Sequence, residues 1–210
     1  MGLTELKDIL VKHEITLEEV RGVVAIDAYN ALYQFLSIIR QKDGTPLMDS
    51  QGRISSHLSG LFYRTCGMLE KGVLPVYVFD GKPSDLKKKT IAERVERKRE
   101  AEELLKQARE EGREADAAML AQRTSRLTKD MAGEAKQLLA LMGLPVVLAP
   151  SEGEAECSVL CEKGLVKAAC SQDFDSLLFG TPRLVRNLAI AGRRKLPRRE
   201  IYVDVVPEEF

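Results

Sequence analysis

The chain has 210 residues, with 32 Lys and Arg against 32 Asp and Glu, and its formal net charge is zero. Hydrophobic residues make up 44% and charged residues 30%, which is typical of a globular protein with a sizeable core and an ionic surface. No apolar stretch approaches the roughly 20 residues of a membrane-spanning helix, and the N-terminus lacks the pattern of a secretory signal. We therefore expect an intracellular protein without membrane association.

The predicted elements alternate between strands and helices. Runs of four to eight apolar, β-branched residues are typical of buried strands in a parallel sheet covered on both faces. Such runs end at Asp27 and Asp80, occupy 144–148, and precede Asp173. Apolar residues at helical spacing predict helices over 28–41, about 55–70 and 131–142, with a further helix starting within 151–164. This alternation predicts an α/β, doubly wound sheet.

Six carboxylates lie just after these apolar runs. Parallel strands end at one edge of a sheet, and ligands of open α/β sheets bind outside those carboxyl ends. The six side chains would converge there, and their charges would repel one another unless cations lay between them. A pair of hard divalent cations such as Mg²⁺, which prefer carboxylate oxygen and water, resolves this repulsion. The predicted metal ligands are Asp27, Asp80, Glu152, Glu154, Asp173 and Asp175.

Simpler interpretations stay open for parts of this pattern. An Asp or Glu after a strand is often only a helix N-cap or a turn former. Asp173-Phe-Asp175 superficially resembles the DxD loop of small-molecule phosphohydrolases, whose first Asp is a covalent nucleophile, but that function would leave four acids unexplained. Cys157 and Cys161 could share a metal, yet without a CxxC motif or a nearby His we expect buried small hydrophobic residues.

A charged stretch over 82–129 interrupts the alternation. Residues 82–99 hold eight Lys or Arg against three Asp or Glu, and we predict two helices broken near Gly112. A solvated hairpin held by local ion pairs would explain this composition. The position directly after Asp80 favours a basic arch that draws a polyanion toward the metal site. A second basic run, 183–199, holds seven Lys or Arg and no acid, and it fits either a solvent-facing loop or a phosphate contact.

Five segments resemble the flap endonuclease family of structure-specific 5′ nucleases, and its archaeal members most of all. They are IDAYNALYQFL, SHLSGLFYRT, PVYVFDGKP, APSEGEAE and SQDFDSLLFG, in the family's order along nearly the whole chain. The resemblance implies a PIN-like, mainly parallel sheet with a charged helical arch inserted after the second strand. It also implies a monomeric 5′ flap endonuclease with 5′–3′ exonuclease activity, which hydrolyses branched DNA in replication and repair.

The resemblance assigns roles to single residues. The six acids would bind two Mg²⁺ ions roughly 4 Å apart, for which Mn²⁺ can substitute. Lys87 and Arg94 correspond to catalytic residues at the base of the arch that contact the scissile phosphate. Tyr33 corresponds to an aromatic that stacks on a base, and Gly2 to the residue exposed by removal of the first Met. The residues expected to contact DNA are Gly2, Tyr33, Arg40, Arg64 and Glu152.

The family normally continues beyond Phe210. It has a further helix with a seventh metal-binding Asp, then a helix–two-turns–helix motif for duplex DNA and a tail that docks on the sliding clamp. We therefore expect a truncated chain with an N-terminal nuclease region (1–98) that includes the arch base, the rest of the arch (99–129) and an incomplete internal nuclease region (130–210). An alternative is a DNA-structure-binding fragment with weak or no catalysis, because the last ligand and the duplex-binding motif are missing.

Overall fold

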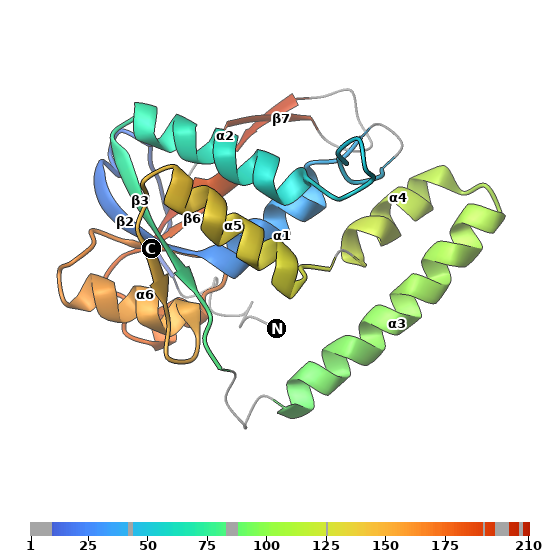
Figure 1. The fold of residues 1–210 in the computed structure, drawn as a ribbon. Helices are drawn as coiled ribbons and strands as arrows, with labels where there is room; N and C mark the ends of the chain where they lie inside the picture. The colour runs from blue at the N-terminus through green and yellow to red at the C-terminus, as the bar shows by residue number, and fades with distance from the viewer. Residues whose placement is uncertain are drawn as a thin grey trace.

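A computed structural model describes residues 10–41, 44–82, 88–124, 126–190, 192–195, 202–205 and 208–210. Its centre is a seven-stranded sheet in the order β1-β9-β6-β5-β2-β3-β4, and Figure 1 shows helices packed against both faces. The sheet contains β1 (His13–Glu14), β2 (Gly22–Asp27), β3 (Val73–Phe79), β4 (Val146–Leu148), β5 (Ala169–Cys170), β6 (Leu184–Arg186) and β9 (Glu208–Glu209). A separate antiparallel pair consists of β7 (Gly192–Lys195) and β8 (Tyr202–Val205).

The helices are spread along the whole chain. They are α1 (Ala28–Ile38), α2 (Ser56–Glu70), α3 (Lys88–Glu110), α4 (Glu114–Arg123), α5 (Lys129–Leu141), α6 (Gly153–Glu162), α7 (Asp175–Leu178) and the short 3-10 helix η3 (Leu188–Ile190). The predicted helices after Asp27, before β3, before β4 and after β4 are thus all present, with ends shifted by one to three residues, as frayed helix ends lead one to expect. None of the described helices combines the length and the apolar character that crossing a membrane requires.

The middle of the sheet is parallel. Strand β2 pairs in parallel with β3 along its full length, from Gly22 opposite Val73 to Asp27 opposite Val78, and with β5 through Ala25 opposite Ala169. Strands β3 and β4, and β5 and β6, also pair in parallel. Strand β9 pairs antiparallel with β6, and β1 pairs antiparallel with β9, which extends the sheet beyond β6. All strands that precede the six acids therefore end at the same edge.

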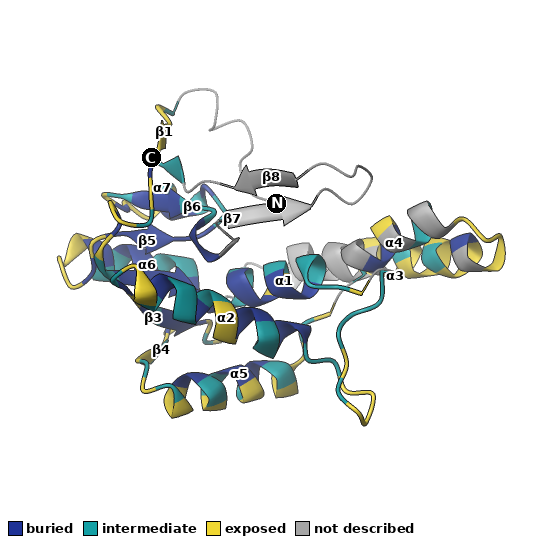
Figure 2. Ribbon diagram, turned by 90° about the horizontal axis from the view of Figure 1, so that it is seen from above, coloured by how far each residue is buried: buried dark blue, intermediate teal, exposed yellow. Residues whose placement is uncertain are grey.

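Two hydrophobic cores cover the two faces of the sheet. The larger one joins α1, α2 and α5 to the sheet and includes the fully buried Phe35, Leu61 and Tyr77. The smaller one joins α6 to the opposite face and contains Cys157 and Cys161, which are buried as expected. Helix α6 contacts β2, β3 and β5. Figure 2 shows the buried strands between exposed helix faces, and the doubly wound fold is confirmed.

The inserted helices α3 and α4 project from the body as a hairpin (Figures 1 and 2). The break predicted near Gly112 is confirmed, since this glycine takes the left-handed conformation, with φ of 68°, between the two helices. Ala108 is fully buried in the hairpin, and α4 also contacts α1. Local ion pairs on its surface, such as Arg99 with Glu96 at 2.7 Å, match the solvated-hairpin interpretation for the part whose side chains are described.

Candidate metal centre

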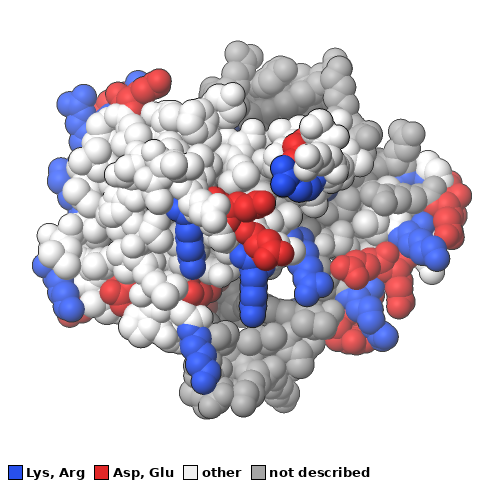
Figure 3. Space-filling view, in the orientation of Figure 1, with Lys and Arg blue, Asp and Glu red and all other residues white. Residues whose placement is uncertain are grey.

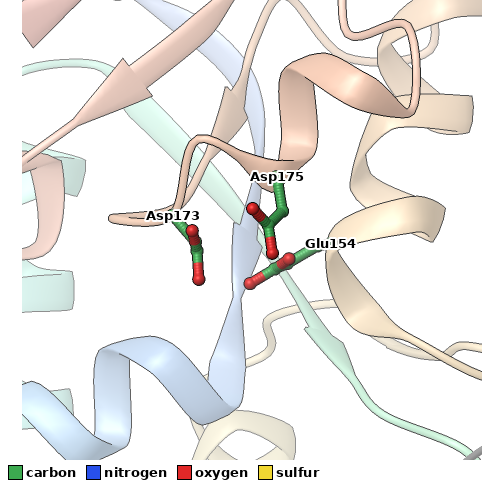
Figure 4. Close-up of side chains that lie close together, drawn as sticks. All are labelled: Glu154, Asp173 and Asp175. Atoms are coloured by element: carbon green, nitrogen blue, oxygen red, sulfur yellow. The ribbon is translucent and has the colours of Figure 1, made fainter. Parts of the chain in front are cut away.

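Three carboxylates meet beyond the carboxyl ends of β4 and β5. Glu154 lies in the first turn of α6, Asp173 follows β5, and Asp175 begins α7. One oxygen from each lies within 4.8 Å of the others, and Figure 4 shows the three side chains pointing toward a common space. All three are partly buried. Without a cation, this arrangement concentrates negative charge in a region of restricted solvent, which is costly.

Asp27 lies next to this cluster and is the most buried of the six acids, with 5% of its surface exposed. Burial raises the pKa of Asp27 from 3.8 to about 7, and the charges of Asp80 and Asp173 push it in the same direction. A hydrogen bond from the Asn30 backbone N–H to Oδ1, at 3.0 Å, opposes the shift and makes Asp27 the N-cap of α1. The N-cap interpretation is therefore correct for Asp27, and the same carboxyl also faces its acidic neighbours.

Asp80 directly follows β3, and its side chain contacts the start of α6. Its Oδ1 accepts a hydrogen bond of 2.7 Å from the Gly153 backbone N–H, one of the N–H groups at a helix N-terminus that favour an anion. A Cβ added at Gly153 would lie only 2.9 Å from Asp80 Oδ1 and 3.8 Å from Asp27 Oδ1. Glu152 occupies the N-cap position of α6 and is half-buried. The glycine between the two glutamates thus allows two further acids to approach the helix end.

The donor set suits a hard divalent cation. It consists of carboxylate oxygens without thiol or imidazole, which is the ligand chemistry of Mg²⁺, Mn²⁺ or Ca²⁺ rather than of a structural zinc site. The oxygens of Glu154, Asp173 and Asp175 are near enough to bind one ion together. Asp27 and Asp80 lie near each other, since one carboxylate oxygen of each is within 4 Å of the position that a Cβ at Gly153 would take.

Helix α1 carries two tyrosines, and Tyr29 is near enough to Asp80 to be affected by its charge. Tyr33, predicted to stack on a base, is 45% exposed, which leaves its ring accessible. Tyr29, one turn earlier, was not predicted, although its position two residues after Asp27 and four before Tyr33 offered a signal. Burial raises the pKa of the Tyr29 hydroxyl, and the charge of Asp80 adds to the rise. Its ring contacts Phe79 edge-on, with centroids 5.8 Å apart.

Arg40 lies at the junction of the body and the inserted helices. Its guanidinium donates hydrogen bonds to the carbonyl oxygens of Ser37 at 3.3 Å, Gly44 at 2.8 Å and Ala121 at 3.0 Å. The last of these ties α4 to the end of α1. Arg64 lies in α2 and is half-buried, and burial lowers the pKa of both arginines. Neither arginine belongs to the acidic cluster.

The start of the second basic run is engaged within the protein. Arg183 pairs with Glu209 at 2.8 Å, and the Arg186 guanidinium stacks over the Phe174 ring at 4.3 Å. Arg186 Nε also donates to the Gln172 carbonyl at 3.0 Å. Arg186 therefore supports the loop that carries Asp173, whereas Arg183 contacts β9. The other basic residues of this run lie where no side chain is described.

Three predicted site residues cannot be placed. Gly2 and Lys87 lie outside the described residues, and Arg94 lies in α3 at a position whose side chain is not described. Their assigned roles stay predictions. Figure 3 shows acidic and basic side chains intermixed on the face that includes the projecting helices, with an opening between these helices and the body.

Comparison with known protein families agrees with this architecture. The XPG N-terminal domain matches residues 1–101, and the XPG I-region matches residues 143–209. Flap endonuclease-1 from Methanococcus jannaschii superposes with a TM-score of 0.70 at 36% identity, covering 98% of this chain and 62% of that one. The catalytic core of Rad2 in complex with DNA substrate superposes with a TM-score of 0.62 at 30% identity, covering 94% and 50%. Fold and site define an α/β protein of the XPG, PIN-like class.

Comparison with curated relatives identifies the family within this class. Flap endonuclease 1 of Pyrococcus furiosus is 57% identical over 202 residues, or 96% of this chain and 59% of its own length. That of Caldivirga maquilingensis is 57% identical over 212 residues, or 99% and 61%. The chain belongs to the flap endonuclease family. It spans about three fifths of the length of these relatives.

Proposed function

We propose that this chain is the metal-dependent nuclease region of a structure-specific 5′ flap endonuclease with 5′–3′ exonuclease activity, acting in DNA replication and repair. The observation that carries the proposal is the meeting of Glu154, Asp173 and Asp175 within 4.8 Å at the carboxyl edge of a parallel sheet, in a chain of this family. The substrate class is branched DNA with a 5′ flap.

The acids would hold two cations, Mg²⁺ in the cell and Mn²⁺ as a substitute. Glu154, Asp173 and Asp175 would bind together, and Asp27, Asp80 and Glu152 would complete the centre. Cations bound there would neutralise phosphate charge and bring the pKa of water near neutrality. Asp27 would give up its carboxyl proton when the centre fills, because a neighbouring positive charge favours the ionised carboxylate.

Other residues would position the DNA. Tyr33 has the exposed ring that base stacking requires, and such stacking contributes about 1–3 kcal/mol per base. Arg40 and Arg64 would approach phosphates of the duplex, and Gly2 and Glu152 would line the path of the strand. Lys87 and Arg94 would add positive charge opposite the scissile phosphate as preorganised electrostatic stabilisers.

The experiment that tests this function is cleavage of a labelled 5′-flap oligonucleotide by the chain with Mg²⁺, with Mn²⁺ or with EDTA. We expect cation-dependent cutting near the junction, and its loss in Asp173→Asn/Asp175→Asn. Asp130→Asn, an exposed acid in the first turn of α5, is the matched control and should cut like the unsubstituted chain.

The same assay decides the alternative function. A chain that binds the flap substrate but does not cut it with either cation would be a DNA-structure-binding fragment, and the nuclease proposal would be wrong for these 210 residues. A monomeric state, and docking on a sliding clamp through the tail of longer family members, stay predictions that rest on the resemblance. An intracellular location, in the cytoplasm or nucleoid, stays a prediction as well. Sedimentation of the chain would test the monomeric state, and sedimentation of a longer chain that includes the tail, with and without a purified clamp, would test docking.

A further inference from the structure

Three buried hydroxyl groups lie between α6 and α7, behind the acidic cluster. They belong to Ser158, Ser176 and Thr181, which are 0%, 0% and 7% exposed. We call them the hydroxyl cluster. Ser158 lies on α6, one turn after Glu154, and Ser176 directly follows Asp175 in α7. The cluster therefore connects the two helices that carry two of the three converging carboxylates.

Ser158 bridges the backbones of both helices. Its hydroxyl lies 2.9 Å from the Glu154 carbonyl oxygen and 3.2 Å from the Ser176 carbonyl oxygen, and it hydrogen-bonds the Thr181 hydroxyl. Thr181 in turn donates to the Ser176 carbonyl at 2.7 Å. Two side chains thus converge on the carbonyl that follows Asp175, and one of them also reaches the carbonyl of Glu154.

The hydroxyl cluster has fewer protons to donate than oxygen atoms that could accept them. A hydroxyl has one proton to donate and two lone pairs to accept with. Thr181 uses its proton on the Ser176 carbonyl, so the single Ser158 proton is shared among three nearby oxygen atoms. The Ser176 hydroxyl has no hydrogen-bond partner among the described residues. In such a desolvated group each hydrogen bond counts for more than in water, and small shifts of the helices would break one of them.

We propose that the hydroxyl cluster sets the separation of Glu154 and Asp175 for binding a divalent cation. Ser158 and Thr181 are then positioning residues that act through the backbone of the ligands without touching the cation. The proposal rests on the metal centre of the proposed function. Mg²⁺ demands near-ideal octahedral geometry, and sites of this kind tolerate displacements of only about 0.5 Å.

The test compares cation affinity with stability in matched variants. Ser158→Ala removes the bridge. Ser56→Ala is its control, because Ser56 is equally buried and its hydroxyl also joins two backbone groups, the Ile39 carbonyl at 2.7 Å and the Leu47 N–H at 2.8 Å, away from the acids. Mn²⁺ affinity is measured by titration calorimetry and stability by thermal melting. We expect both variants to have a lower melting temperature than the unsubstituted chain. Only Ser158→Ala should lose about 10-fold or more in Mn²⁺ affinity, which is the usual effect of removing a residue that hydrogen-bonds a metal ligand.

A double variant removes both hydroxyls of the bridge. In Ser158→Ala/Thr181→Val the Ser176 carbonyl loses both of its hydroxyl donors, so stability should fall below that of Ser158→Ala. If the cluster positions the ligands, Mn²⁺ affinity is also lower in the double variant than in Ser158→Ala. If the double variant binds Mn²⁺ as tightly as the unsubstituted chain, or if Ser158→Ala binds Mn²⁺ as Ser56→Ala does, the inference is wrong.

Two further outcomes are distinguishable. Should Ser158→Ala not fold, Thr181→Val carries the comparison, with Thr65→Val as control, since the buried Thr65 hydroxyl bonds the Tyr77 hydroxyl at 2.8 Å away from the acids. An unsubstituted chain that binds no Mn²⁺ would overturn the metal centre itself and the positioning role with it. If the metal centre exists and only the positioning role is wrong, all variants of the hydroxyl cluster should bind Mn²⁺ as the unsubstituted chain does.

Discussion

Replacing Asp27 by Asn should stabilise the cation-free protein at neutral and alkaline pH. The folded pKa of Asp27 is about 7 against 3.8 in the unfolded chain, so between these values the native state binds more protons than the unfolded state. Stability contributed by this group is therefore highest below about pH 4, falls as pH rises and levels off above about pH 7. The full loss is on the order of 4 kcal/mol, from about 1.4 kcal/mol for each pKa unit.

Asn removes the charge and keeps the local structure. Its side-chain oxygen can accept the same hydrogen bond from Asn30, and Asn is as good an N-cap as Asp. At pH 8 in EDTA the variant should therefore melt about 10 °C above the unsubstituted protein, since 1 kcal/mol moves the melting temperature of a chain of this size by about 2–4 °C. At pH 4 the two should melt together.

Scanning calorimetry at both pH values provides the assay. Adding Mg²⁺ at pH 8 should raise the melting temperature of the unsubstituted protein much more than that of Asp27→Asn. Asp130→Asn, which alters an exposed acid, should follow the unsubstituted protein throughout. Equal melting temperatures for Asp27→Asn and the unsubstituted protein in EDTA at pH 8 would refute the reasoning, because the buried charge would then cost nothing.

Three more predictions concern neighbouring features. Gly153→Ala places a methyl group 2.9 Å from Asp80 Oδ1 and should weaken Mn²⁺ binding about 10-fold by calorimetry, whereas Gly133→Ala, where the new Cβ meets no atom within 4 Å, should not. Lys87→Ala or Arg94→Ala should slow flap cleavage by about 10²-fold or more while binding in a gel-shift assay changes far less; equal losses would make them simple phosphate anchors. Arg40→Ala removes the bond to the Ala121 carbonyl, so limited trypsin digestion should cut the inserted helices sooner, and unchanged digestion would show that Arg40 does not hold α4.

The strands that carry the acids could be predicted because their signals are local. The runs ending at Asp27 and Asp80 are apolar, β-branched and followed by helical patterns, so both their type and their direction could be inferred. Strand β1 had no such signal. His13 and Glu14 are exposed and polar, and they form a strand only because Glu208 and Glu209 lie beside them.

In the candidate metal centre, too, some features follow from local sequence signals and others depend on contacts between distant segments. The carboxyl ends of parallel strands fix where Glu154, Asp173 and Asp175 come together, whatever the details of packing. The part played by Ser158 depends on Thr181 and on the Ser176 carbonyl, which come near only after α6 and α7 have packed. No spacing in the sequence announces such a contact, since Ser in a helix usually bonds only the carbonyl four residues before it.

The position of β2 between β3 and β5 also determines at which stage of folding the candidate metal centre can form. Ala25 pairs with Ala169, so β5 can join the sheet only after all residues up to Cys170 have left the ribosome, which releases about 5–20 residues per second. Contacts so distant in sequence close late in folding, because the long intervening loop must first be ordered. Until then the four earlier acids, Asp27, Asp80, Glu152 and Glu154, stand without Asp173 and Asp175, so Glu154 lacks both carboxylates that meet it in the finished structure. A nascent chain therefore lacks the complete set of carboxylates, and the candidate metal centre forms together with the finished sheet.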